Sequence, residues 1–434
     1  MEPGLIGILG IALLLILLAS GMKVAYVMGL VGFLGFLFLA NSKVAFGVLY
    51  NLPYQEFASW QFSVIPLFIL MGNFSFFSGI TADLFKSARK CLGHIPGGLG
   101  VATVAAAAGF AAATGASMAS AAAMSKIAVP EMEKHGYQRK LALGTVASGG
   151  TLAGVIPPSI GLIIYGMITE TSIARLLIAG ILPGIMIACM LAIFIVLRVI
   201  HSPHLAPVVP EVPFMEKLLS LRKIWGIAVV IFCVLGSLYF GVTTPTEAAA
   251  FGAMGAFIIA LALRRLNKSN TKQSLFDTGR TTAMIMLILV CGTIFSRFLT
   301  MSGVPDDFTG GITNLNLSPF AIITAVGITY LILGMFLDQL SITVITLPVF
   351  FPLVVSLGFD PVWFGIFFDV LTNLGQITPP IGLVCFVIKG SVPNCTLEEV
   401  FAGVAPFFIV EILAIIILTI FPKIATFLPG LMMQ

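Results

Sequence analysis

Charged residues are scarce in this sequence: Asp, Glu, Lys and Arg make up 9% of its 434 residues, while 59% of the residues are hydrophobic. A water-soluble protein of this length needs more polar surface than these residues supply. The mean hydropathy is +1.11, and apolar runs of about 20 residues, the length that crosses a bilayer core of ~30 Å, recur along the whole chain. The composition therefore excludes an ordinary soluble fold and predicts a protein embedded in a lipid bilayer.

Patterns that bind metals or nucleotides are also missing. The six cysteines include no C-x-x-C pair, and two of the four histidines, His201 and His204, share a proline-rich loop. These patterns indicate neither a disulfide framework nor a transition-metal site. No phosphate-binding loop of the form G-x-x-x-x-G-K-[ST] occurs, so any uphill transport is expected to depend on an ion gradient. The net charge of +4 comes mostly from a few loops, so nucleic acid is not expected as a partner.

Two tandem prolines interrupt the apolar sequence, and each follows a run of small and polar residues. The first motif is TLAGVIPP at 151–158 and the second is NLGQITPP at 373–380, so the two lie 222 residues apart. Proline removes an amide donor and pushes the preceding residue out of helical geometry, which leaves carbonyl groups unpaired. Within a bilayer such backbone is tolerated only beside a cavity or a bound ion. Pro130 and Pro352 keep the same spacing, and the pattern therefore predicts an internal duplication with one broken helix in each half.

Basic residues gather in four loops that the positive-inside rule assigns to the cytoplasm. They are Lys86, Arg89, Lys90; Lys134, Arg139, Lys140; Arg198, Lys217, Arg222, Lys223; and Arg264, Arg265, Lys268, Lys272, Arg280. The first two clusters flank the Ala- and Gly-rich segment 95–130, which is predicted to be a helical hairpin that turns inside the membrane. A full double crossing is the alternative. Segment 317–357 is flanked by Asp306, Asp307 and Asp360 without a basic residue, and it is predicted to be a second hairpin that enters from the opposite face.

These signals predict an all-α polytopic membrane protein made of two inverted-topology repeats. Residues 1–200 form the first repeat, 201–222 a cytoplasmic linker and 223–434 the second repeat. Each repeat is expected to contain five crossings and one hairpin, and an odd number of crossings makes the repeats antiparallel. The crossings are expected at 4–21, 24–41, 57–79, 141–168 and 173–200, and at 224–241, 247–263, 281–301, 361–388 and 400–420. A short segment, 82–92, alternates charged and apolar residues and is expected to lie in the interface as an amphipathic helix.

Each hairpin tip is expected to face the broken helix of its own half and to bind a cation there. Carbonyl groups at the end of a half-helix attract cations, and a ligand set made only of oxygen favours Na⁺ over a transition metal. The candidate ligands of the first site are Thr114, Gly115, Ser117, Ser148, Thr151 and Gly154, and those of the second are Asp338, Ser341, Thr372, Asn373, Gln376 and Thr378. For any single small residue among them, close helix packing is an equally good explanation.

Asp338 is the most specific of these candidates, because an ionised carboxylate near the middle of a membrane costs roughly 3 kcal/mol on insertion scales. Its partner is expected to be a sodium ion or Arg297. Arg297 could instead bind a substrate carboxylate, with Pro157 and Ser159 at the first break as further candidate substrate contacts, or snorkel to the lipid headgroups. Asp369 and Glu411 also lie in apolar runs, and they are interpreted as structural because neither is close in sequence to a break.

The motifs resemble the large membrane subunit of the tripartite ATP-independent periplasmic (TRAP) transporters, within the ion-transporter superfamily of elevator carriers. The segments that carry the resemblance are GTLAGVIPPSI at 150–160, GMFLD at 334–338 and GQITPPIG at 375–382. The resemblance implies a sodium site at each tip and break. It also implies a mobile transport domain that holds both hairpins and broken helices, and a scaffold of the remaining spans. Ala116 stands at a position of the first hairpin tip where the family often has a serine, so only its backbone carbonyl could bind a cation.

The same resemblance implies sodium symport of an organic acid across the bacterial inner membrane. A periplasmic binding protein would deliver the substrate, and a small four-span membrane subunit would be a second partner, expected as a separate polypeptide. Sialic acid and C4-dicarboxylates are the familiar substrates; we favour sialic acid, although no residue separates the two.

Two other functions stay open from the residues alone. An intramembrane hydrolase would need a catalytic pair such as Asp338 with Asp369, but no G-x-G-D or G-x-S-x-G motif is present. An enzyme is therefore not expected. The second alternative is a membrane subunit with a purely structural role, which predicts that transport by its complex does not depend on sodium or on Asp338.

Overall fold

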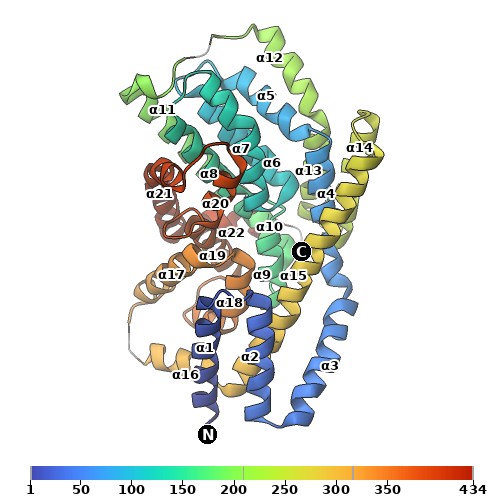
Figure 1. The fold of residues 1–434 in the computed structure, drawn as a ribbon, viewed down its shortest axis with the longest axis vertical. Helices are drawn as coiled ribbons and strands as arrows, with labels where there is room; N and C mark the ends of the chain where they lie inside the picture. Colours follow the sequence, from blue (N-terminus) through green and yellow to red (C-terminus); the bar gives the residue numbers. More distant parts are fainter. Residues whose placement is uncertain (1, 209, 315–316, 433–434) are drawn as a thin grey trace.

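The computed structural model describes the whole chain except residues 1, 209, 315–316 and 433–434. Within the described residues the regular structure consists of α-helices and short 3₁₀ helices, without strands. Eight of these helices are long and apolar enough to cross a membrane, or nine if a bent pair near residue 222 counts as one span. The prediction of an all-α polytopic membrane protein is therefore confirmed (Figure 1).

Four helices form the N-terminal part of the chain, and one of them was not predicted. They are α1 (Pro3–Ala19), α2 (Val24–Leu39), α3 (Ser42–Ala58) and α4 (Val64–Phe77), with the 3₁₀ helix η1 (Trp60–Ser63) before α4. The side chain of Asn41 caps α3 by accepting from the Val44 amide at 3.0 Å. Sequence reasoning missed α3 because Lys43, Asn51, Pro53 and Glu56 interrupt its apolar pattern.

The following helices contain the first predicted hairpin and the first break. They are α5 (Ile80–Leu92), α6 (Gly98–Thr114), α7 (Ser117–Lys134), α8 (Arg139–Val155), α9 (Ile160–Thr169), α10 (Ile173–Ala179) and α11 (Ile181–His201). Helices α6 and α7 meet at Gly115 and Ala116, inside the segment 95–130. Between α8 and α9 the chain leaves helical geometry at residues 156–159. Helix α5 buries Leu84 and Phe85 and exposes Lys86, as expected of an amphipathic helix.

The second half repeats this order after the short helix α12 (Phe214–Leu221) in the linker. Its helices are α13 (Trp225–Tyr239), α14 (Pro245–Ala262), α15 (Lys268–Ser302), α16 (Val304–Thr313), α17 (Pro319–Phe336), α18 (Gln339–Ser356), α19 (Pro361–Gly375), α20 (Leu383–Ser391), α21 (Leu397–Ile420) and α22 (Lys423–Leu431). The expected span 281–301 was too short. Helix α15 begins at Lys268, because the Asn267 side chain caps it and its polar first half continues the helix beyond the apolar run.

Corresponding helices of the two halves begin about 222 residues apart. Helices α6, α7, α8 and α9 begin at residues 98, 117, 139 and 160, while α17, α18, α19 and α20 begin at 319, 339, 361 and 383. The region of α3 and α4 differs, since a single long helix, α15, takes their place in the second half. These bounds agree with the expected duplication, and the antiparallel placement of the halves in the membrane stays a prediction.

The helices form two packed groups, which meet where α15 contacts α18 and α4 contacts α6. Helix α8 lies against α6, α7 and α21, and α19 lies against α17, while α9 contacts α18 and α20 contacts α7. The second part of each broken helix therefore packs on the hairpin of the other half. Helices α1, α2, α4, α13, α14 and α15 form the second group, in which α15 packs along α2 and α14 along α4.

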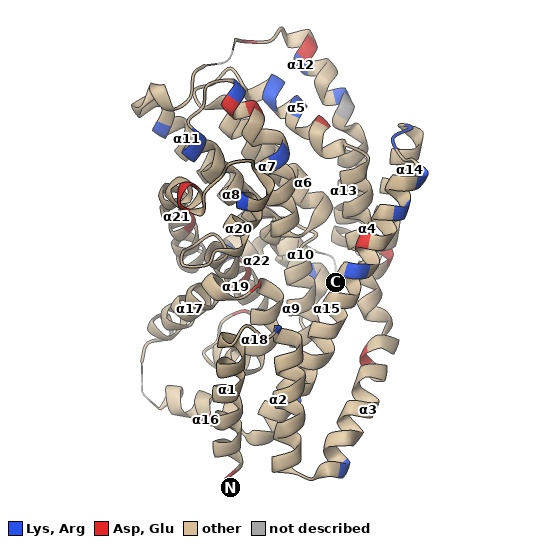
Figure 2. Cartoon of the chain, in the orientation of Figure 1, with Lys and Arg blue, Asp and Glu red and all other residues tan. Residues whose placement is uncertain are grey.

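The charged residues mark the two ends of the molecule. Figure 2 shows many Lys and Arg residues at the end that carries α5, α11 and α12, and few at the opposite end near the N-terminus. This distribution agrees with a cytoplasmic position for α5 and the linker under the positive-inside rule.

Candidate functional site

The first hairpin tip is fixed directly onto the first break. Gly115 has a φ of +61°, a conformation that favours glycine, and a Cβ atom added there would overlap the Pro158 carbonyl oxygen. The Ile160 amide donates to the Gly115 carbonyl oxygen at 3.1 Å. Thr114 donates its hydroxyl to the Phe110 carbonyl at 3.2 Å within its own helix. The tip therefore presents backbone oxygens and one hydroxyl beside the nonhelical segment 156–159.

The second tip is held in a corresponding way. The amide of Gly382, the residue 222 positions after Ile160, donates to the Met335 carbonyl of α17 at 3.3 Å. Close to this contact Gly334 and Gly375 pack backbone against backbone, and a Cβ on either would lie within 3.0 Å of the other's backbone. The tip of each hairpin therefore contacts the helix that follows the break in the same half, which is α9 in the first half and α20 in the second.

Residues assigned to the two predicted sodium sites contact one another. The Ser117 hydroxyl donates to Asn373 Oδ1 at 2.6 Å, although Ser117 was assigned to the first site and Asn373 to the second. A Cβ added to Gly154 would overlap the Asn373 side-chain amide. The two predicted sites are therefore connected through Asn373 rather than separate.

Asp369 lies at the centre of this connection. Asn373 Nδ2 donates to the Asp369 backbone oxygen at 2.8 Å and to its carboxylate at 3.2 Å, and Gln339 Nε2 also donates to the carboxylate. Asp369 is completely buried. The hydrogen-bonded series Ser117, Asn373, Asp369 and Gln339, called here the inter-hairpin network, joins the first residue of α7 to the first residue of α18.

The interpretation of Asp369 as remote from the breaks is therefore wrong, while its role as a structural residue or a ligand is not tested by these contacts. Asp369 precedes Asn373 by one helical turn, and residues at i and i+4 lie on the same face of a helix. This spacing was the signal in the sequence that could have placed Asp369 at the site. Its contact with Gln339 depends on tertiary packing and has no such signal.

Glu411 contacts the other side of the first break. Its Oε1 atom lies 3.2 Å from the Thr151 hydroxyl, which also lies 2.7 Å from the Ser148 carbonyl oxygen. The buried Ser148 hydroxyl faces the same carboxyl without forming a well-aligned hydrogen bond. Glu411 is 2% exposed. The interpretation of Glu411 as distant from a break is also wrong, because α21 packs along α8 and brings it to Thr151.

Asp338 caps α18 instead of pairing with Arg297. The Ser341 amide donates to Asp338 Oδ2 at 3.1 Å, and the Ser341 hydroxyl donates to Oδ1. Among the described residues no ion pair joins Asp338 to Arg297, so this alternative for the partner of Asp338 is not observed. Arg297 is exposed on α15.

The remaining predicted ligands of the second site are buried and bonded within their own segment. The hydroxyl of Thr372 lies 3.0 Å from the carbonyls of Phe368 and Asp369, and the Thr378 hydroxyl donates to the Leu374 carbonyl at 2.7 Å. Gln376 is buried beside them. Each hydroxyl keeps lone pairs that could bind a cation.

The predicted substrate residues lie in different surroundings. Pro157 and Ser159 are buried at the break, where the Ser159 hydroxyl caps α9 by accepting from the Leu162 amide at 3.2 Å. No hydrogen bond or ion pair of the described residues connects this segment to Arg297. The structure therefore does not bring the three residues into one contact set.

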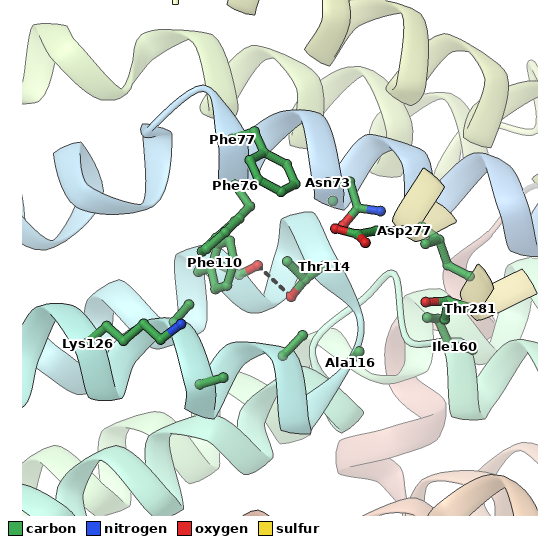
Figure 3. A pocket seen from close by; sticks show the side chains of 15 residues that line it. Asn73, Phe76, Phe77, Phe110, Thr114, Ala116, Lys126, Ile160, Asp277 and Thr281 are labelled. Atoms are coloured by element: carbon green, nitrogen blue, oxygen red, sulfur yellow. Dashed lines mark hydrogen bonds between the residues drawn. The ribbon is translucent and has the colours of Figure 1, made fainter. Parts of the chain in front are cut away.

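A cavity of about 270 Å³ lies between the first hairpin tip and helices α4 and α15. Thr114 and Ala116 of the tip line it, together with Asn73, Asp277 and Lys126. Figure 3 shows Asn73 and Asp277 next to each other on one side and Lys126 on the other. Asn73 Nδ2 donates to Thr278 at 2.9 Å, which leaves the amide oxygen available. Phe76, Phe77 and Phe110 supply apolar walls, so the cavity combines a cation, a carboxylate and an apolar surface.

Comparison with known proteins identifies the family of the sequence. Residues 11–424 match the family model of the tripartite ATP-independent periplasmic transporter, DctM component. A large permease protein of a C4-dicarboxylate TRAP transporter from Pseudomonas aeruginosa is 35% identical over 368 residues, covering 84% of this chain and 85% of that protein. Its counterpart from Vibrio cholerae is 33% identical and covers 98% of both chains. These relatives are named as transporter permeases, which are not enzymes.

Other relatives are named for different substrates, and some are longer. A sialic acid TRAP transporter permease from Haemophilus influenzae is 29% identical over 86% of this chain, which spans 60% of that protein. Among solved structures, the YdaH transporter of Alcanivorax borkumensis has a TM-score of 0.64 at 12% identity, with 89% of this chain and 90% of that chain covered. At this identity the likeness supports the fold alone.

Proposed function

This chain belongs to the DctM family of tripartite ATP-independent periplasmic transporters, and we propose from this membership that it carries an organic acid into the cell together with sodium ions. It is a multi-pass protein of the bacterial inner membrane, not an enzyme. The partners in this proposal are a small membrane subunit and a periplasmic binding protein that delivers the substrate. The alternative of an intramembrane hydrolase has no support from the relatives.

One observation carries the sodium coupling. Two carboxylates, Asp369 and Glu411, are buried beside the two breaks, and neither forms an ion pair with a basic side chain of the described residues. A buried charge without a partner costs several kcal/mol, so such a group needs a proton or a bound cation. The Glu411 carboxyl contacts the Thr151 hydroxyl, and oxygen ligands of this kind suit Na⁺. The Asp369 carboxylate instead accepts from the side-chain amides of Gln339 and Asn373, which leave its negative charge unneutralised.

The proposed ligands are those expected from the sequence, with two additions. Thr114, Gly115, Ser117, Ser148, Thr151 and Gly154 are the residues of the first site, and Glu411 faces its hydroxyls. Asp338, Ser341, Thr372, Asn373, Gln376 and Thr378 are the residues of the second site, to which Asp369 is added through its contact with Asn373. Because Asn373 contacts both sets, we expect sodium binding at one site to strengthen binding at the other.

The elevator mechanism is supported by the division of the helices into two groups. The hairpins and broken helices pack on one another across the halves, which suits a single mobile transport domain. The cavity beside Thr114 lies where this domain meets α4 and α15. We propose that substrate occupies this cavity, where Lys126 attracts its carboxylate and Asn73 accepts from a hydroxyl or amine.

The substrate is proposed only as a class. Relatives are named for C4-dicarboxylates, sialic acid and ectoine, and all three are small carboxylates. A C4-dicarboxylate and sialic acid are the first two candidates, because two relatives that align over most of this chain carry the former name and another carries the latter.

The experiment is uptake into proteoliposomes that contain this chain and its small membrane subunit, with the loaded binding protein outside. An inward sodium gradient is expected to drive accumulation of one acid from a panel of succinate, sialic acid and ectoine. A potassium gradient of the same size is the control. Equal accumulation under both gradients would contradict sodium coupling, and no accumulation of any organic acid would contradict the transport proposal itself.

A further inference from the structure

A second cavity lies at the basic end of the molecule and is unrelated to the hairpin tips. It has a volume of about 740 Å³ and lies between α5, α7 and the linker helix α12. Four basic residues line it, against two carboxylates: Lys86, Arg89, Lys90 and Lys134, with Glu131 and Glu216. The cavity therefore has an excess of positive charge.

Two of the four basic residues in the cavity form ion pairs, and two lysines do not. Arg89 pairs with Glu131, and Lys90 pairs with Glu216 at 3.0 Å. Lys86 and Lys134 are exposed, and neither has a carboxylate within 4.0 Å among the described residues. The unpaired charge comes from α5 and from α7, so an anion bound between these lysines would bridge the two helices.

The cavity wall also has an apolar part, beside the hydroxyls of Ser87 and Ser220. Phe85, Ile127 and Leu219 contribute to the cavity wall. Helix α12 exposes Phe214, Met215 and Leu218, as does a helix that lies in the membrane interface with its apolar face in the acyl chains. Figure 2 shows Lys and Arg residues gathered at this end of the molecule, which agrees with a cytoplasmic position of the cavity under the positive-inside rule.

We propose that this cavity is a binding site for an anionic phospholipid. The phosphate of its headgroup would bind Lys86 and Lys134, and the start of an acyl chain would lie on Phe85 and Leu219. Basic pockets between helices on the cytoplasmic side suit anionic headgroups, and the apolar wall favours a lipid over a free phosphate ion. The bound lipid stabilises the contact of α7, the second helix of the first hairpin, with α5 and the linker.

The test measures thermal unfolding of the purified full-length protein in neutral detergent with added lipid. Phosphatidylglycerol is expected to raise the unfolding temperature more than phosphatidylcholine at the same mole fraction, because a ligand stabilises the folded state that binds it. The variant with Lys86→Gln and Lys134→Gln is expected to lose most of this difference, and native mass spectrometry is expected to show fewer retained lipids.

The control variant carries Lys268→Gln and Lys272→Gln, which remove the same charge from an exposed part of α15. It is expected to respond to phosphatidylglycerol as the unsubstituted protein does. Equal loss in both variants would mean a general charge effect and would overturn the proposal, as would full retention in the Lys86 and Lys134 variant. A third measurement adds inorganic phosphate in place of lipid. If phosphate raises the unfolding temperature as much as phosphatidylglycerol does, the cavity is a site for a free anion and the lipid proposal is overturned. If the glutamine variant does not fold, Lys86→Arg with Lys134→Arg must retain the response.

Discussion

Asp369 is the residue on which the sodium hypothesis depends most directly. It accepts from Gln339 and Asn373 without a basic partner among the described residues, so its negative charge is the part of the network that a cation would neutralise. An asparagine has the same shape but no charge. The change Asp369→Asn therefore removes the charge at nearly constant shape, and it keeps one of the two acceptor oxygens.

We predict that Asp369→Asn raises the sodium concentration for half-maximal uptake by about tenfold or more, since interactions with a charged group contribute ~1.5–3 kcal/mol. The measurement is the sodium dependence of uptake in proteoliposomes. Asp360→Asn is the matched control, because Asp360 caps α19 at 2.7 Å from the Val362 amide and asparagine caps equally well. An unchanged sodium dependence in Asp369→Asn would show that its charge is not involved.

A substitution at Gly154 would test the contact between the two halves, because one added Cβ atom disturbs it. A Cβ at this position would overlap the Asn373 amide, so Gly154→Ala must displace Asn373 from Ser117. We predict a loss of stability of roughly 1–3 kcal/mol, typical of overpacking, together with loss of uptake. Thermal unfolding and uptake are measured side by side.

The control for Gly154→Ala is Gly279→Ala, where a Cβ would meet open space. Alanine favours a helix over glycine, so this control is expected to keep full stability and uptake. Normal uptake by Gly154→Ala would show that the Ser117 to Asn373 contact is dispensable for transport.

At the scale of a helix, Asp338 has two possible roles that one pair of substitutions distinguishes. Its carboxylate caps α18 through the Ser341 amide, and asparagine performs this role as well as aspartate does, whereas alanine costs about 1 kcal/mol. We predict that Asp338→Asn keeps the unfolding temperature but loses most sodium-driven uptake, and that Asp338→Ala loses both. Wild-type uptake in Asp338→Asn would reduce the role of Asp338 to capping.

The helices also show which features could be predicted from the sequence. The breaks were visible because tandem prolines act on their own backbone, and the hairpin turn at Gly115 because glycine and small residues interrupt the apolar run. Helix α3 and the first half of α15 were missed because their polar residues hide the periodicity. The contacts of Asp369 with Gln339 and of Glu411 with Thr151 were missed for another reason, because they join different helices and depend on packing. Only the spacing of Asp369 and Asn373 was visible in the sequence.

At the scale of the whole molecule, the arrangement of the two groups of helices predicts relative motion. The first hairpin tip faces α15 across the cavity that Ala116 and Thr281 both line. If the transport domain moves as a unit while α15 stays in place, the separation of these two residues must change between states. A fixed pore would keep it constant.

We predict that a protein with Ala116→Cys and Thr281→Cys, in a background without the six native cysteines, cross-links to different extents with and without sodium. Sodium and substrate together shift the population between states, because a ligand favours the state that binds it better. The control pair is Ala116→Cys with Ile160→Cys, since the Ile160 amide bonds Gly115 within the proposed moving domain, and its cross-linking should not change. Identical yields for the Ala116 and Thr281 pair under all conditions would exclude the elevator motion, whereas a change confined to this pair would locate the moving boundary between the first hairpin and α15.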